Sequence, residues 1–179
     1  EEEGSLELIL AQPVSRSLGF WSRTPALILS VGLILLIVWG GAAIGLELHD
    51  FDLTQEQLVR PFISLFSILI LFLCLALILS MVLASSGSAS LAAGFLLIAS
   101  YFISSLARID EDLEGINHFS PLKYYQGGTA VNGLNFEHTL LLLSLAAIFL
   151  LLAWFFFVKR DMRFGGTGGL RLVFKRGEK

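Results

Sequence analysis

Four long runs of apolar residues, separated by polar stretches, set the pattern of this chain. They cover residues 25–46, 62–84, 90–106 and 139–158. A helix needs about 20 predominantly apolar residues to cross the hydrocarbon core of a bilayer, and each run reaches or approaches that length. The pattern therefore predicts an all-α fold, a polytopic membrane helix bundle with four transmembrane helices.

Helix and turn signals set the expected ends of these spans. Thr24 and Pro25 are typical of an N-cap and a first helical turn, so we expect the first span to begin there. Arg60-Pro61 is expected to open the second span. The small, polar residues 84–90 indicate a tight turn before the third span.

Small residues recur at four-residue spacing in two of the spans. The pairs are Gly41 with Gly45 and Ser90 with Gly94. Such spacing allows another helix to approach closely, and packing within the bundle is favoured over pairing of subunits. Because the third span is the least apolar, with Ser100 and Ser104 on one face, we expect other helices to enclose it. That face could line a substrate path or simply pack.

Residues 1–18 form the long non-membrane segment before the first span. Their pattern predicts a short amphipathic helix over Glu2–Ala11, which Pro13 ends because proline cannot continue a helix interior. Leu6 and Leu10 share its apolar face with Ile9. Glu3 and Glu7 lie beside that face, where their charge suits the N-terminal end of the helix dipole.

The connector 107–138 is the longest loop between the spans. It begins with an acidic cluster and continues with apolar residues at helical spacing, which predicts two short amphipathic helices at the membrane surface. Ser120 would cap the second helix and Pro121 would start it. After the last span, residues 159–179 form a basic tail that would lie on an anionic membrane surface or stay disordered.

The distribution of positive charge predicts the orientation in the membrane. Nine of the twelve Lys and Arg residues lie in residues 1–24 and 159–179, and three lie in the two long connectors. Four spans place both termini on one side, and the positively charged side is the cytoplasmic one. We therefore expect residues 1–18 and 159–179 in the cytoplasm and residues 107–138 outside.

Composition agrees with a membrane protein and excludes several kinds of chemistry. Of the 179 residues, 55% are hydrophobic, above the roughly 45–50% of soluble domains, and a soluble bundle with an unusually apolar core is the disfavoured alternative. The spans contain no Asp, Glu, Lys, Arg or His, which argues against an ion-coupled pump. The chain has no P-loop and no metalloprotease or hydrolase motif. We expect no catalytic residue, no directly bound cofactor and no enzyme activity.

Three histidines and one cysteine are the remaining candidates for special chemistry. His49, His118 and His138 all fall on the expected outer side but are far apart in sequence, so interfacial polar roles are favoured over a metal site. Cys74 has no partner for a disulfide within the chain, and we expect a small residue facing lipid or the bundle.

The string E-x-G-x-L-E-L-x-L-A-x-P-V-S-R at residues 2–16 resembles the cytoplasmic segment of type-2 permeases of ABC transporters. In that family the segment lies between the second and third membrane spans and docks on the ATP-binding subunit. The alternative is an ordinary interfacial helix leading into a span. The resemblance implies that the coupling residues are Glu3, Gly4, Leu6, Glu7, Leu8, Leu10, Pro13, Val14, Ser15 and Arg16.

Two later elements also resemble these permeases. F-S-P-L-x-Y-Y at residues 119–125, followed by Asn132-Gly133, is similar to an outer region whose short helices dip into the membrane. The last span ends in a phenylalanine-rich stretch that leads into Arg160-Asp161, and this resembles the usual C-terminal end of the last span in that family. Two further spans would then precede Glu1, so that the chain is a fragment, which we favour, or a reduced permease.

The resemblance implies a membrane subunit of an exporter in the cell membrane, with ATP and Mg²⁺ held by a separate ATPase subunit. A second permease copy, identical or paralogous, would complete the transporter, and no nucleic acid is expected as a partner. Some relatives serve the maturation of copper enzymes. Apolar spans with scattered Ser and Tyr would accept lipids, drugs or peptides alike. The competing function is a non-transport scaffold or assembly subunit that anchors partners.

Overall fold

Helices account for the regular structure of this protein. The computed structural model describes residues 16–49, 53–83, 85–107, 109, 114–118 and 120–159, and these ranges contain no strand. Four helices are long and apolar enough to cross a membrane, so the prediction of an all-α, multi-pass membrane protein is confirmed. They are α2 (Arg16–Leu48), α3 (Gln55–Val82), α4 (Ser86–Leu106) and α6 (Phe136–Lys159).

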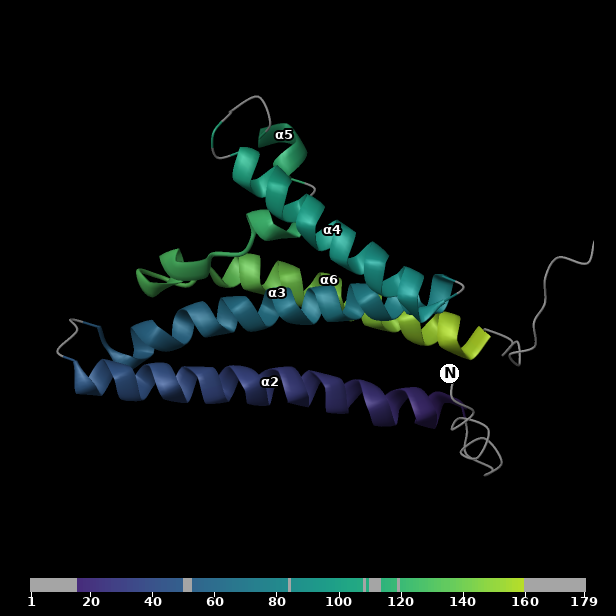
Figure 1. The fold of residues 1–179 in the computed structure, drawn as a ribbon, viewed down its shortest axis with the longest axis horizontal. Helices are drawn as coiled ribbons and strands as arrows, with labels where there is room; N and C mark the ends of the chain where they lie inside the picture. The colour runs from purple at the N-terminus through teal and green to yellow at the C-terminus, as the bar shows by residue number, and fades with distance from the viewer. Residues whose placement is uncertain are drawn as a thin grey trace, which may run out of the picture.

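Helix α3 is the centre of the arrangement, because α2, α4 and α6 all pack on it (Figure 1). The rings of Phe20 in α2 and Phe157 in α6 lie 5.5 Å apart between centroids. The beginning of α2 and the end of α6 therefore meet at one end of the bundle, which we name the terminal end. At the opposite end, named the cap end, α4 diverges from α3, and α5 lies at the far end of α4 (Figure 1).

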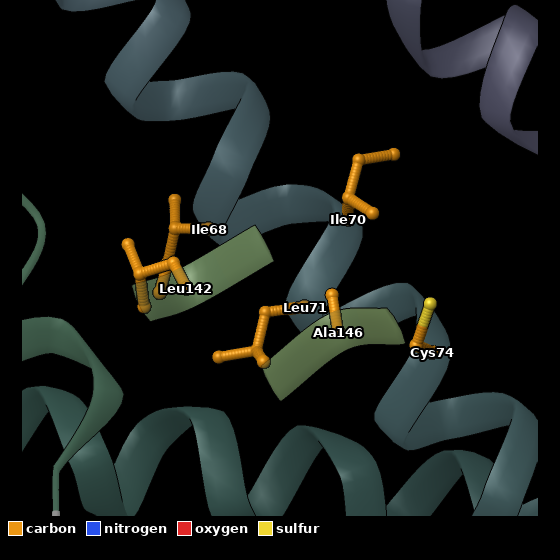
Figure 2. Packing of buried hydrophobic residues seen from close by; sticks show 6 residues of the cluster. All are labelled: Ile68, Ile70, Leu71, Cys74, Leu142 and Ala146. Atoms are coloured by element: carbon orange, nitrogen blue, oxygen red, sulfur yellow. The ribbon is translucent and has the colours of Figure 1, made fainter. Parts of the chain in front are cut away.

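The tightest packing joins α3 to α6. Leu71 and Cys74 of α3 are 0% and 1% exposed, and Leu142 and Ala146 of α6 are 1% and 2% exposed. Figure 2 shows Leu142 beside Ile68, and Ala146 between Leu71 and Cys74. Because hydrocarbon offers no hydrophobic drive for helix association, such contacts stabilise the pair through close packing. A small side chain at position 146 allows that approach.

Helix α2 begins earlier than the sequence predicted. It is continuous from Arg16, and Pro25 lies inside it. Thr24 is not an N-cap: it is 2% exposed and its hydroxyl donates to the Phe20 carbonyl at 3.0 Å. The predicted start at Thr24-Pro25 is therefore wrong. Proline inside a spanning helix is tolerated where neighbouring groups compensate for the missing donor.

Helix α3 also begins before its proline. Thr54 and Gln57 form a capping box, in which Gln57 Oε1 accepts from Thr54 N at 2.9 Å and Thr54 Oγ1 accepts from Gln57 N at 3.4 Å. Pro61 lies inside the helix, so the predicted start at Arg60-Pro61 is wrong. The Thr-x-x-Gln spacing is the stronger start signal, because it satisfies two backbone donors at once.

The two remaining spans differ from expectation at their first turns. Ser85 caps α4, with its Oγ accepting from Ser88 N at 3.2 Å, so the predicted turn over 84–90 is shorter and residues 86–90 are helical. Helix α6 begins at Phe136 rather than Thr139, because Asn135 Oδ1 accepts from Glu137 N at 2.9 Å. Both helices start at a short polar side chain that binds free backbone donors.

Helix α4 is less enclosed than its composition suggested. Leu91 and Phe95 are 77% and 70% exposed, although Ala89 is buried. Within the described part of this one chain, other helices do not surround this span, and its enclosure by further helices stays a prediction.

Candidate functional site

Of the residues predicted to couple the chain to an ATPase, the structure describes Arg16, which is the first residue of α2 at the terminal end. The other predicted coupling residues lie outside the described residues: Glu3, Gly4, Leu6, Glu7, Leu8, Leu10, Pro13, Val14 and Ser15. The amphipathic helix over 2–11 stays a prediction.

The small-residue pairs do not bring helices together in the part of the chain that the structure describes. A Cβ built at Gly41, Gly45 or Gly94 would meet no atom within 4 Å, and Ser90 is exposed. Within the described residues of one chain, no other helix therefore packs closely against these four positions.

A compact unit at the cap end is the most elaborate polar arrangement in the described residues. We name residues 114–118 and 120–135 the cap; it contains α5 (Glu114–Asn117), η2 (Pro121–Lys123) and η3 (Gly127–Val131). The prediction that Pro121 starts a short helix is confirmed. The third short helix, η3, was missed, because Gly127-Gly128 reads as a turn in sequence and Gly127 indeed has φ +51°.

Helix α4 holds one side of the cap through buried hydroxyl groups. Ser104 Oγ donates to Asn117 Oδ1 at 3.0 Å and lies 2.8 Å from Ser120 Oγ. Ser120 Oγ in turn donates to the Ser100 carbonyl at 3.1 Å. Ser120 stands at the N-cap position of η2, but its side chain makes no cap hydrogen bond. The predicted capping role is wrong because the hydroxyl bonds α4 instead.

Helix α3 holds the other side of the cap. Gln126 N donates to Ser64 Oγ at 3.1 Å, and Ser64 is 2% exposed. Arg60 Nη1 donates to the Val131 carbonyl at 3.3 Å. Ser64 follows the first residue of α3 by nine positions, which at 1.5 Å per residue places it about 14 Å along the helix axis. The cap therefore reaches well down along the spanning helices.

One side chain closes the cap onto α6. Gln126 Oε1 accepts from Asn135 N at 3.0 Å, and Gln126 Nε2 donates to the Asn135 carbonyl at 3.1 Å. Asn135 also supplies the side-chain oxygen at the N-terminus of α6. The Gln126 amide therefore joins the cap to the first turn of the last span.

Removing the Ser104 hydroxyl should loosen the cap. Ser104→Val removes the hydroxyl that donates to Asn117 Oδ1 and contacts Ser120 Oγ, which costs about 1–3 kcal/mol. We expect faster backbone amide exchange at residues 114–125 in bicelles, measured by hydrogen–deuterium exchange. Ser90→Val, on the exposed face of the same helix, is the control and should leave that exchange unchanged. Equal exchange in both variants would contradict the assigned role of Ser104 in holding the cap.

The structure keeps the three histidines apart. The His49 ring Nδ1 lies 3.2 Å from the Gly45 carbonyl, His118 contacts Lys123 Nζ, and His138 packs edge-on against Tyr124. Among the described residues, no three His, Cys, Asp or Glu side chains are grouped as metal ligands. Cys74 lies between α3 and α6, so the expected bundle-facing position is confirmed.

A pocket of about 650 Å³ lies where the first turns of α3 face the last residues of the cap and the start of α6. Glu56 and Arg60 form an ion pair at 2.7 Å on its α3 wall. Val59 and Ile63 line the same wall, and Asn132 and Phe136 lie opposite. Sequence reasoning missed this pocket because its two walls lie some 70 positions apart along the chain.

Residues 2–163 match the sequence model of the family described as "Protein of unknown function (DUF2705)". No curated protein and no solved structure matches the chain.

Proposed function

This chain belongs to the DUF2705 family, and we propose that it is the membrane-spanning permease subunit of an ATP-binding cassette transporter. It moves substrate across the membrane, and the energy comes from ATP that a separate subunit binds with Mg²⁺ and hydrolyses. The observation that carries the proposal is the string at residues 2–16, which resembles the coupling segment of type-2 permeases. Its last residue, Arg16, is the first residue of the spanning helix α2.

The arrangement of the ends supports this proposal. Phe20 and Phe157 bring the start of α2 and the end of α6 together, so the coupling segment and the basic tail attach at the same end of the bundle. Nine of twelve Lys and Arg residues belong to these two regions. By the positive-inside rule the terminal end faces the cytoplasm, where an ATPase subunit can reach residues 1–18.

The cap supports the same proposal from the other end. The F-S-P-L-x-Y-Y element resembles an outer permease region with short helices that dip into the membrane. Here η2 and η3 are short helices that bind Ser64 of α3 and the Ser100 and Ser104 region of α4. Leu122, Tyr124 and Tyr125 pack against the α3–α6 core.

The mechanism that follows is indirect. ATP binding closes two ATPase subunits, and their movement passes through residues 1–16 into α2. Helix α2 touches α3 and α6 but is mostly exposed, so it can shift while the tight α3–α6 pair moves as a unit. A cavity between two permease copies then changes its access. Export, and placement in the cell membrane, follow from the resemblance.

Co-purification tests the proposal directly. The full chain, expressed with its membrane partners and solubilised gently, should retain a P-loop ATPase identified by mass spectrometry. Vesicles reconstituted with both subunits should hydrolyse ATP faster when a candidate lipid, drug or peptide is added, and should move that compound. An isolated chain that never retains an ATPase, in membranes where both are present, would contradict the proposal.

A scaffold or assembly subunit is the competing function. It is favoured by one observation: the buried serines of α3 and α4, Ser64 and Ser104, are engaged in holding the cap. A neighbouring gene for a P-loop ATPase would favour the transporter, and binding of partners without any ATP-dependent movement would favour the scaffold.

A further inference from the structure

The pocket at the cap end combines charged and apolar walls in an ordered way. Glu56 and Arg60 lie on the first two turns of α3, and Ile63 lies deeper along the same helix. At 1.5 Å per residue, Ile63 is about 10 Å further along the axis than Glu56. Phe136, the first residue of α6, is 76% exposed at the rim. On the α3 wall, Glu56 therefore lies nearer the helix end and Ile63 nearer the middle of the span, with Val59 and Arg60 between them.

Arg60 has spare hydrogen-bonding capacity in this pocket. A guanidinium carries five N–H donors; Nη1 donates to the Val131 carbonyl and Nη2 to Glu56. The side chain is 29% exposed, so it is fixed by the cap yet still reachable. Arginine in such a position suits a phosphate group, which it can bind through two parallel hydrogen bonds.

The ion pair with Glu56 is easily exchanged for a ligand. Glu56 is 80% exposed, and an exposed i, i+4 pair contributes only about 0.3–0.5 kcal/mol. A phosphate that replaces the Glu56 carboxylate at Arg60 therefore costs the protein little stability. The volume of about 650 Å³ lies within the roughly 300–1,000 Å³ of ligand pockets.

We propose that this pocket binds one phospholipid molecule. The phosphate sits on the Arg60 guanidinium, and the first acyl carbons run past Ile63 toward the middle of the span, with Val59 and Phe136 lining the pocket near its rim. This apolar lining around and below Arg60 favours a lipid over a free phosphate ion. The site concerns the cap end and is separate from the proposed coupling segment, so it stands whether or not the chain is a permease.

Lipid retention by the full chain tests this assignment. The protein in detergent micelles is mixed with phosphatidylglycerol, phosphatidylcholine, diacylglycerol or inorganic phosphate, and bound molecules are counted by native mass spectrometry. We expect one retained phospholipid of either kind and no retained diacylglycerol or inorganic phosphate. Retention of diacylglycerol at equal affinity would overturn the role of the phosphate, and binding of inorganic phosphate alone would overturn the lipid.

Two variants of the ion pair should act in opposite directions. Arg60→Gln should weaken phospholipid binding about tenfold, whereas Glu56→Gln should tighten phosphatidylglycerol binding several-fold, because it removes the competing negative charge. Glu56→Gln changes an exposed side chain and should fold normally. Unchanged or weaker binding in Glu56→Gln, or unchanged binding in Arg60→Gln, would overturn the proposal. Val59→Trp, which fills the pocket and keeps Arg60, should also lose the lipid.

Discussion

Replacing Ala146 by phenylalanine should separate α3 from α6. Ala146 is 2% exposed and lies against Leu71 and Cys74 (Figure 2), so a ring at this position has no space without moving a helix. Overpacking of a tight core costs about 1–3 kcal/mol, and here it affects the most extensive contact of the bundle. We expect a lower free energy of unfolding in SDS titration from mixed micelles.

The chain carries its own reporter and its own control for this prediction. Cys74 is the single cysteine and is 1% exposed, so a membrane-permeant maleimide should label it slowly in the wild type and much faster in Ala146→Phe. Ala147→Phe adds the same ring at the exposed neighbouring position of α6 and should leave labelling slow. Equal rates in the two variants would show that Ala146 does not set the α3–α6 distance.

Leu8→Asp should uncouple ATP hydrolysis from transport if residues 1–16 dock on an ATPase subunit. The predicted coupling helix buries an apolar side chain in the partner, and an unpaired carboxylate there costs several kcal/mol of binding. Glu7→Arg should act in the same way through charge reversal. We expect normal membrane insertion, loss of ATP-dependent transport in vesicles, and ATPase activity that no longer responds to substrate.

Charge reversal at the opposite end provides the control. Glu47→Arg changes an exposed acidic residue of α2 at the cap end and should leave transport intact. A cysteine introduced at position 7 of a Cys74→Ala chain should react with an impermeant maleimide only from the cytoplasmic side. Labelling from outside, or normal transport by both Leu8→Asp and Glu7→Arg, would refute the coupling role.

The number and kind of elements could be read from the sequence. Apolar runs of about 20 residues become helices in a membrane because only an intact helix satisfies its own backbone there. All four spans were found for this reason, and Pro121 correctly indicated the start of η2. Pro25 and Pro61 are not start signals, because both lie inside helices that begin earlier: α2 begins at Arg16, and α3 begins at Gln55 after the capping box at Thr54.

Four membrane-spanning helices could be predicted from the chain's apolar runs, since length and hydrophobicity are local properties. The partners of the polar side chains depend instead on how the helices pack. Ser64 binds Gln126, 62 positions away, and Ser104 binds Ser120, 16 positions away. A serine in an apolar run can bond its own helix or a distant segment, and only the packing of α3, α4 and α6 selects the partner. The cap and the Arg60 pocket form because of these long-range contacts.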